Sequence, residues 1–113
     1  MPRAIGWLVL FLALALGGCG KKPVLPEAAQ ELTKGHRVVL LSATWCGYCD
    51  RLRADFNQAG IAFQEWDVEH SETGAALRSE LGGGLTVPVT LIDHQAFYGY
   101  QPDTIIARAR AGD

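Results

Sequence analysis

The sequence has little that would suit a nucleic-acid or nucleotide partner. Its 113 residues carry 10 Lys and Arg against 12 Asp and Glu, and the cations form no stripe. A protein that follows a phosphate backbone needs such a stripe, so no nucleic-acid partner is expected. The glycines at positions 82–84 lack the Lys-Ser/Thr that completes a phosphate-binding loop, and we interpret them as a connector.

Histidine and cysteine are also scarce, with three of each. His36, His70 and His94 stand singly, with no close pair of the kind that zinc sites use. A metal site that combines Cys46 and Cys49 with two of these histidines is an alternative that the spacing disfavours. No metal and no other cofactor is therefore expected.

The longest apolar run, Ile5 to Leu16, is shorter than the roughly 20 apolar residues that a membrane-spanning helix needs. It follows Arg3 and precedes small residues, an order typical of a secretory signal. Residues 1–18 are therefore expected to be removed on export. An exported chain enters an oxidising compartment, in which a pair of cysteines can cycle between dithiol and disulfide.

The segment Leu16-Gly17-Gly18-Cys19 resembles a bacterial lipobox. The resemblance implies that Cys19 is acylated and becomes the first residue of the mature protein, which anchors it to a membrane. We therefore expect a lipoprotein of the bacterial cell envelope that faces the periplasm or the cell exterior. Gly20, in place of Asp, favours the outer membrane where the cell has two. Residues 19–34, which contain Pro23 and Pro26, are predicted to form a flexible linker.

The most informative feature present is Trp45-Cys46-Gly47-Tyr48-Cys49, between an apolar run and a helical pattern. A cysteine at a helix N-terminus lies beside unpaired N–H groups and the positive end of the helix dipole, which favour the thiolate. The thiolate is the species that attacks in disulfide exchange. Cys49 follows one helical turn later, where it can displace a partner joined to Cys46. The pattern predicts a redox-active pair.

The pattern of residues 35–113 predicts a single α/β domain with the element order β-α-β-α-β-β-α. The expected strands cover residues 38–41, 61–67, 86–92 and 95–98, and the expected helices run from the cysteines to Gly60, after the N-cap Ser71, and from Pro102. In the first helix, the predicted inward face consists of Cys49, Leu52 and Phe56. Its predicted outward residues are Asp50, Arg51, Arg53 and Asp55.

The cysteine pair, followed about forty residues later by Thr86-Val87-Pro88 in this element order, resembles the thioredoxin superfamily and, within it, the glutaredoxins. The resemblance covers about residues 37–111. It implies a three-layer sandwich with a mixed central sheet, Cys46 as nucleophile, Cys49 as resolving thiol, and a cis peptide bond at Pro88. It also implies a substrate-binding surface made of Trp45, Gly47, Tyr48, Thr86, Val87 and Pro88.

The sequence departs from the family pattern at three places near the cysteines. The dipeptide between them is Gly47-Tyr48, where glutaredoxins commonly carry Pro-Tyr. Glutathione-using glutaredoxins carry a lysine shortly before the first cysteine, whereas this stretch, residues 42–45, has no cation. Leu40 stands six residues before Cys46, where thioredoxins keep a buried acid, so no carboxylate is expected there.

Together these features predict a monomeric extracytoplasmic thiol–disulfide oxidoreductase that exchanges disulfides with cysteine-containing exported proteins and with an upstream redox partner. Two alternatives stay open. One is a non-catalytic thioredoxin-like binding module whose disulfide is only structural, and the other is a metal-binding lipoprotein that uses cysteine and histidine.

Overall fold

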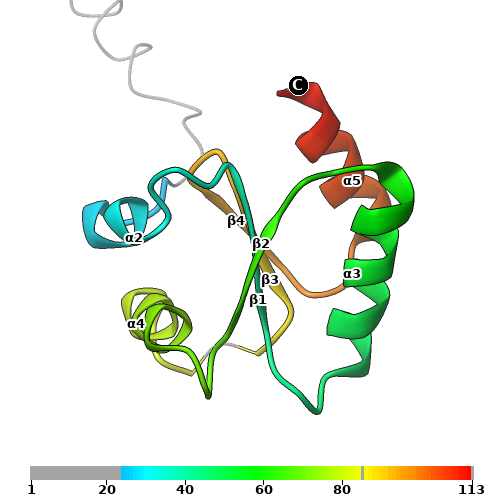
Figure 1. Cartoon of the computed structure of the whole chain (residues 1–113). Helices are drawn as coiled ribbons and strands as arrows, with labels where there is room; N and C mark the ends of the chain where they lie inside the picture. Colours follow the sequence, from blue (N-terminus) through cyan, green and yellow to red (C-terminus); the bar gives the residue numbers. More distant parts are fainter. Residues whose placement is uncertain (1–23, 85, 113) are drawn as a thin grey trace, which may run out of the picture.

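The computed structural model describes residues 24–84 and 86–112, which fold as a sheet with helices on both faces (Figure 1). The four strands stand in the order β2-β1-β3-β4. β1 pairs in parallel with β2 and antiparallel with β3, and β4 is the antiparallel neighbour of β3. The strands are β1 (Val38–Ser42), β2 (Gln64–Asp67), β3 (Val89–Ile92) and β4 (Gln95–Tyr98).

The helices form the two outer layers. α3 (Gly47–Ala59) and α5 (Pro102–Ala111) cover one face of the sheet, and α2 (Glu27–Leu32) and α4 (Glu72–Glu80) cover the other (Figure 1). All five residues of β1 and all four of β3 are buried, as expected for strands with helices on both sides. The predicted three-layer sandwich with a mixed sheet is confirmed. None of the described helices has the length and apolar character needed to cross a bilayer.

The sheet has two ends that matter for function. At the cysteine end, Leu41 of β1 pairs with Val89 of β3, and β1 leads into the loop before α3. At the distal end, Val38 pairs with Ile92 and the turn Asp93–His94 joins β3 to β4. The described chain begins at the distal end, where the Leu25 N–H donates to the His94 carbonyl over 2.9 Å.

The folded unit starts earlier than expected. Leu25, Ala29 and Thr33 are all buried, and α2 packs against α4. The Thr33 hydroxyl donates to the Ala29 carbonyl over 3.1 Å and closes the end of α2. The prediction of a flexible linker is therefore wrong for residues 24–34, because their apolar side chains complete the core on that face. Residues 19–23 lie outside the described part of the chain.

The other element bounds follow the sequence closely. Gly60 ends α3 in the left-handed region with φ 70°, and Ser71 caps α4 by accepting from the Gly74 N–H, both as predicted. Two strands begin three residues later than expected: β2 at Gln64, and β3 at Val89, after the cis-proline loop. Phe63, predicted to lie in β2, instead packs its ring 5.0 Å from that of Phe56 just before that strand.

Gly74 marks a close approach of α4 to the chain after β2. A Cβ atom at this position would overlap the backbone carbonyl of Asp67. Gly74 itself is buried in α4. The contact holds the loop between β2 and α4 next to the cysteine end of the sheet.

Candidate functional site

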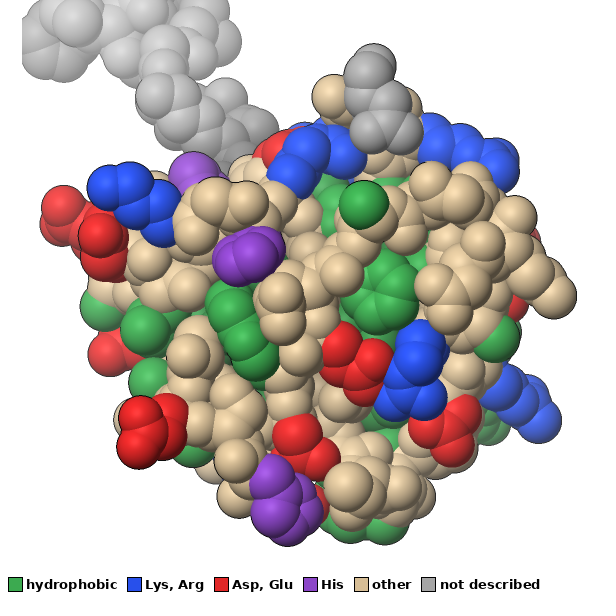
Figure 2. Space-filling model, viewed as in Figure 1, with side chains coloured by type: hydrophobic (Ala, Val, Ile, Leu, Met, Phe, Trp, Pro, Cys, Tyr) green, Lys and Arg blue, Asp and Glu red, His purple; other side chains and the backbone are tan. Residues whose placement is uncertain are grey.

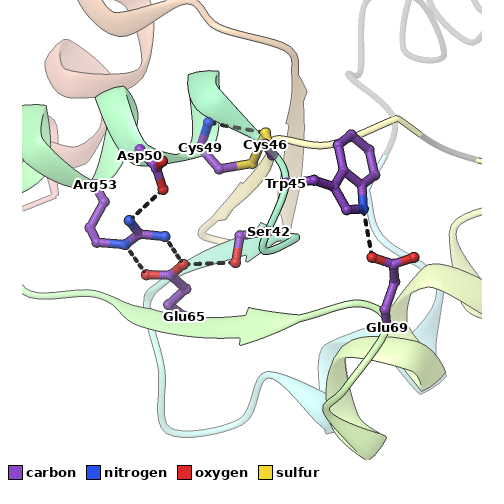
Figure 3. The surroundings of a disulfide bond; sticks show 8 residues. All are labelled: Ser42, Trp45, Cys46, Cys49, Asp50, Arg53, Glu65 and Glu69. Atoms are coloured by element: carbon purple, nitrogen blue, oxygen red, sulfur yellow. Dashed lines mark hydrogen bonds and ion pairs between the residues drawn. A yellow bond between two sulfur atoms is a disulfide. The ribbon is translucent and has the colours of Figure 1, made fainter.

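The two cysteines of the motif form a disulfide at the N-terminus of α3 (Figure 3). Their Cα atoms are 5.2 Å apart. Cys46 is the N-cap residue of α3, and its sulfur accepts a hydrogen bond from the Cys49 N–H over 3.1 Å. This is the predicted position at the start of a helix, where unpaired N–H groups stabilise negative charge on the sulfur.

The two sulfurs differ in access. Cys46 is 5% exposed, whereas Cys49 is 0% exposed and packs in the same buried cluster as Leu41 and Val89 of the sheet. Disulfide exchange requires the attacking thiolate to reach the sulfur along the S–S axis. A partner therefore reaches Cys46 first, and Cys49 is positioned to react from inside.

Two large aromatic side chains lie beside the disulfide and face solvent. Trp45 is 67% exposed and Tyr48 is 56% exposed, so both stand at the predicted rim of the site. The Trp45 indole N–H donates to Glu69 over 2.7 Å (Figure 3). Gly47, between the cysteines, is exposed and has open space where a Cβ would stand. Exposed aromatics next to a reactive group are typical of a docking surface.

The loop before β3 brings the predicted proline to the same end of the sheet. The Val87–Pro88 peptide bond is cis, as the resemblance implies. Val87 is 9% exposed and belongs to the same buried cluster as Cys46 and Cys49, while Thr86 is exposed. The Pro88 carbonyl accepts from the Gly99 N–H over 2.9 Å. The substrate-docking roles of these three residues stay predictions.

Tyr100 is part of the site, although the sequence did not single it out. Its ring stacks on that of Tyr48 with centroids 5.3 Å apart, and its hydroxyl donates to Asp55 over 2.8 Å. The hydrogen bond to Asp55 raises the pKa of the Tyr100 hydroxyl. Arg51 lies 5.5 Å from the centroid of the Tyr48 ring on α3. The signal in the sequence that could have indicated this role is the position of Tyr100, an aromatic residue two positions after the end of β4.

A charged network joins α3 to the sheet behind the disulfide (Figure 3). Arg53 donates through Nε to Glu65 over 2.6 Å and through Nη1 to Asp50 over 2.8 Å. The Ser42 hydroxyl donates to the same Glu65 carboxylate over 2.7 Å. The Arg53 guanidinium lowers the pKa of Glu65 more than any other group does. Both Arg53 and Asp55 were predicted to point outward into solvent. Instead Arg53 is partly buried in this network, and Asp55 is partly buried and accepts a hydrogen bond from Tyr100.

Other predicted site features are only partly described. Leu40 is fully buried on β1, so its position holds no carboxylate. Cys19, the predicted lipidation residue, lies outside the described residues. His36 packs against Trp66, His70 contacts Asp67 and His94 stands in a turn, and within residues 24–84 and 86–112 no three side chains of a metal-binding type come together. The metal-binding alternative has no ligand group there.

Comparison with known proteins gives the family. The glutaredoxin family model matches residues 38–97, just over half of the chain. The chain belongs to the glutaredoxin family. The match runs from the first residue of β1 to Phe97 in β4, and so includes the cysteine pair and the cis-proline loop.

Several family members resemble this chain. Glutaredoxin-C1 of Arabidopsis thaliana is 32% identical over 72 residues, which are 61% of this chain and 58% of that protein. The crystal structure of a buckwheat glutaredoxin–glutathione complex is 31% identical, with a TM-score of 0.56 over 74% of this chain and 77% of that one. A glutaredoxin from Archaeoglobus fulgidus, at 16% identity and a TM-score of 0.59 over 80% and 98%, shares the fold. The chain spans about three-fifths of the length of the relatives it matches.

Proposed function

We propose that this protein is a thiol–disulfide oxidoreductase in which Cys46 is the nucleophile and Cys49 the resolving thiol. The supporting observation is the disulfide at the start of α3, in which Cys46 keeps a small exposed area of 5% and Cys49 is fully buried. Membership of the glutaredoxin family supports the same reaction class.

Cys46 and Cys49 supply both electrons that one turn of substrate reduction requires. In the reduced protein, the Cys46 thiolate attacks one sulfur of a substrate disulfide, a mixed disulfide forms, and the other substrate sulfur leaves as a thiolate that takes up a proton. The Cys49 thiolate then attacks Cys46 and releases the second substrate thiol. Two electrons have passed from the dithiol to the substrate, and an external thiol partner must return two electrons to close the cycle.

The surroundings of the disulfide support both steps. The Cys49 N–H and the other unpaired N–H groups of the first turn stabilise the Cys46 thiolate whenever it is the attacking or the leaving group. Trp45 and Tyr48 offer apolar surface to the substrate. Val87, beside the cysteines, offers an edge along which an extended substrate segment can lie.

The test of this function is reduction of a protein disulfide by dithiothreitol with catalytic amounts of the full chain. Cys46→Ser is expected to lower the rate to that measured without protein. Cys49→Ser is expected to accumulate a mixed disulfide with the substrate, visible by mass spectrometry, because the resolving thiol is gone. An unchanged rate in Cys46→Ser would contradict the proposal and favour the binding-module alternative, in which the disulfide is structural.

The proposed site of action is the bacterial cell envelope, with Cys19 acylated and exported proteins as substrates. The apolar run before Cys19 and the lipobox-like segment support export and anchoring. Gly20 favours the outer membrane.

The anchor is tested by feeding cells a labelled fatty acid and separating membrane from soluble fractions. The wild-type chain is expected to carry label and to sediment with membranes, and Cys19→Ala is expected to lose both properties. Label retained in Cys19→Ala would contradict acylation of this residue.

A further inference from the structure

We propose that Glu69 is a specificity-determining residue that favours substrates with a cationic side chain next to the reactive cysteine. This inference rests on the proposed oxidoreductase function. It adds the chemical class of the protein segment that the site prefers, a cysteine flanked by Lys or Arg.

Glu69 is held at the rim of the disulfide. Its carboxylate accepts from the indole of Trp45, the residue directly before Cys46, over 2.7 Å (Figure 3). Its own N–H donates to Asp67 over 2.7 Å, which fixes the start of the loop that carries it. The carboxylate therefore occupies a defined position on the Trp45 side of the disulfide.

No cation in the described part of the chain pairs with Glu69. Glu65 and Asp50, by contrast, share the guanidinium of Arg53, and Asp67 contacts His70, which carries charge only when protonated. The hydrogen bond from a neutral indole orients the Glu69 carboxylate but leaves its charge uncompensated. A substrate that approaches Cys46 beside Trp45 meets this charge in solvent.

The described cations around the site already have other partners. Figure 2 shows Lys and Arg side chains along the upper edge of this face and on the right of its lower half, and acidic side chains on the left and along the lower part. Arg37 and Arg108 pair with Asp93 at the distal end of the sheet. At the cysteine end Arg53 is paired with two acids, and Arg51 contacts the Tyr48 ring.

Charges at the rim of an interface change association rates more than they change the final affinity, and salt weakens their effect. An uncompensated carboxylate next to Cys46 attracts a substrate cation and repels an anion. Residues 42–45, which lead into Cys46, contribute no cation that would offset it.

The experiment measures single-turnover reduction of three short peptides by the full chain, first reduced and held in neutral detergent. Each peptide has one cysteine in a mixed disulfide with the chromogenic thiol thionitrobenzoate, and the cysteine is flanked by Lys, Gln or Glu. Whichever sulfur Cys46 attacks, closure of the Cys46–Cys49 disulfide yields free thionitrobenzoate and the peptide thiol. The readout is the second-order rate constant for thionitrobenzoate release.

The wild-type chain is expected to reduce the Lys peptide about threefold faster than the Gln peptide, and the Glu peptide slowest, as for exposed charge pairs. Glu69→Gln keeps an acceptor for the Trp45 indole and is expected to remove most of this preference, and Glu69→Lys to reverse it. Glu31→Gln, a matched change at an exposed glutamate of α2, is expected to keep the wild-type order. Added salt is expected to reduce the preference in the wild type.

Two results would overturn the inference: equal rate constants for the three peptides in the wild type, or an unchanged preference in both Glu69 variants. Both are distinct from failure of the proposed function. If the proposed oxidoreductase function itself were wrong, the wild type and Cys46→Ser would release thionitrobenzoate at the same slow rate from every peptide.

Discussion

Tyr100 supports the site indirectly, by holding the exposed ring of Tyr48 in place. Its ring lies behind that of Tyr48, and its hydroxyl is bound to Asp55 on α3. Tyr48, more than half exposed, would otherwise be free to rotate away from the disulfide. The stack therefore keeps the apolar surface of Tyr48 in place next to Cys49.

Tyr100→Phe is expected to lower the free energy of unfolding slightly, because it removes one hydrogen bond to a carboxylate and keeps the stacked ring. Urea unfolding monitored by circular dichroism measures this loss. Asp55→Asn and the double variant complete a double-mutant cycle. If the two single losses simply add, Tyr100 and Asp55 do not interact as described.

Tyr100→Ala removes the ring as well, and its effect should appear in substrate binding. The KM for a protein disulfide is expected to rise about three- to tenfold with a smaller change in kcat, since Tyr48 loses the ring against which it stacks. Steady-state kinetics with the Phe variant as control separates this effect from the loss of the hydroxyl. A lower kcat with an unchanged KM would contradict the supporting role.

At the scale of elements, α3 is fixed to the sheet by the ion pair between Arg53 and Glu65. The pair joins the second turn of α3 to β2, and Ser42 at the end of β1 adds a third element. Because α3 carries both cysteines near its start, the position of the disulfide depends on this attachment. The lowered pKa of Glu65 expresses the same stabilisation of its charged form.

Glu65→Gln is expected to reduce stability at pH 7 by about 1–2 kcal/mol, the loss of a charged hydrogen-bond pair. The folded pKa of Glu65 lies below its ordinary value of 4.5, so its contribution is present above that value and is lost as the pH falls through the lower folded pKa. Urea midpoints measured from pH 7 down to pH 3 should therefore converge for wild type and variant. Glu31→Gln should follow the wild-type curve, and a constant gap at all pH values would contradict the argument.

The close contact at Gly74 predicts that Gly74→Ala lowers stability, whereas helix propensity alone would predict a gain in stability. Gly→Ala inside an exposed helix stabilises by about 1 kcal/mol. Gly74→Ala is instead expected to destabilise by about 2 kcal/mol or more, because the added methyl overlaps the Asp67 carbonyl and forces α4 away from the loop. Gly47→Ala, with open space at its Cβ, is the control and should be neutral or stabilising. Equal effects of the two substitutions in urea unfolding would contradict this packing.

At the scale of the whole molecule, α2 belongs to the folded unit, which can be tested by truncation. A chain that starts at residue 24 is expected to unfold at the same urea concentration as one that starts at Cys19. A chain that starts at residue 35 loses the buried side chains of Leu25 and Ala29 and is expected to be less stable by about 3 kcal/mol. Equal midpoints for all three chains would restore the predicted boundary at residue 35.

The sequence predicted the elements whose pattern is local and strong. The wholly apolar β1 and the periodic face of Cys49, Leu52 and Phe56 need no tertiary information, and the cysteine spacing located the disulfide. The cis bond at Pro88 came from family resemblance rather than from the residues.

The remaining features depend on tertiary contacts. α2 has only six residues and would not be stable alone, so it forms because Ala29 is buried against the core. Arg53 meets Glu65, and Tyr100 meets Tyr48, only after the sheet and helices are assembled. Such pairs join distant positions, and neither charge pattern nor periodicity along the chain identifies them.

The placement of Leu25 beside the turn at His94 has one more consequence. Since the first described residues and the disulfide lie at opposite ends of the sheet, whatever precedes residue 24 can be exchanged without obstructing Cys46. Another protein fused at this point, or immobilisation on a solid support, would leave the sulfurs open to large substrates. We therefore expect the proposed redox chemistry to be separable from the proposed anchoring segment.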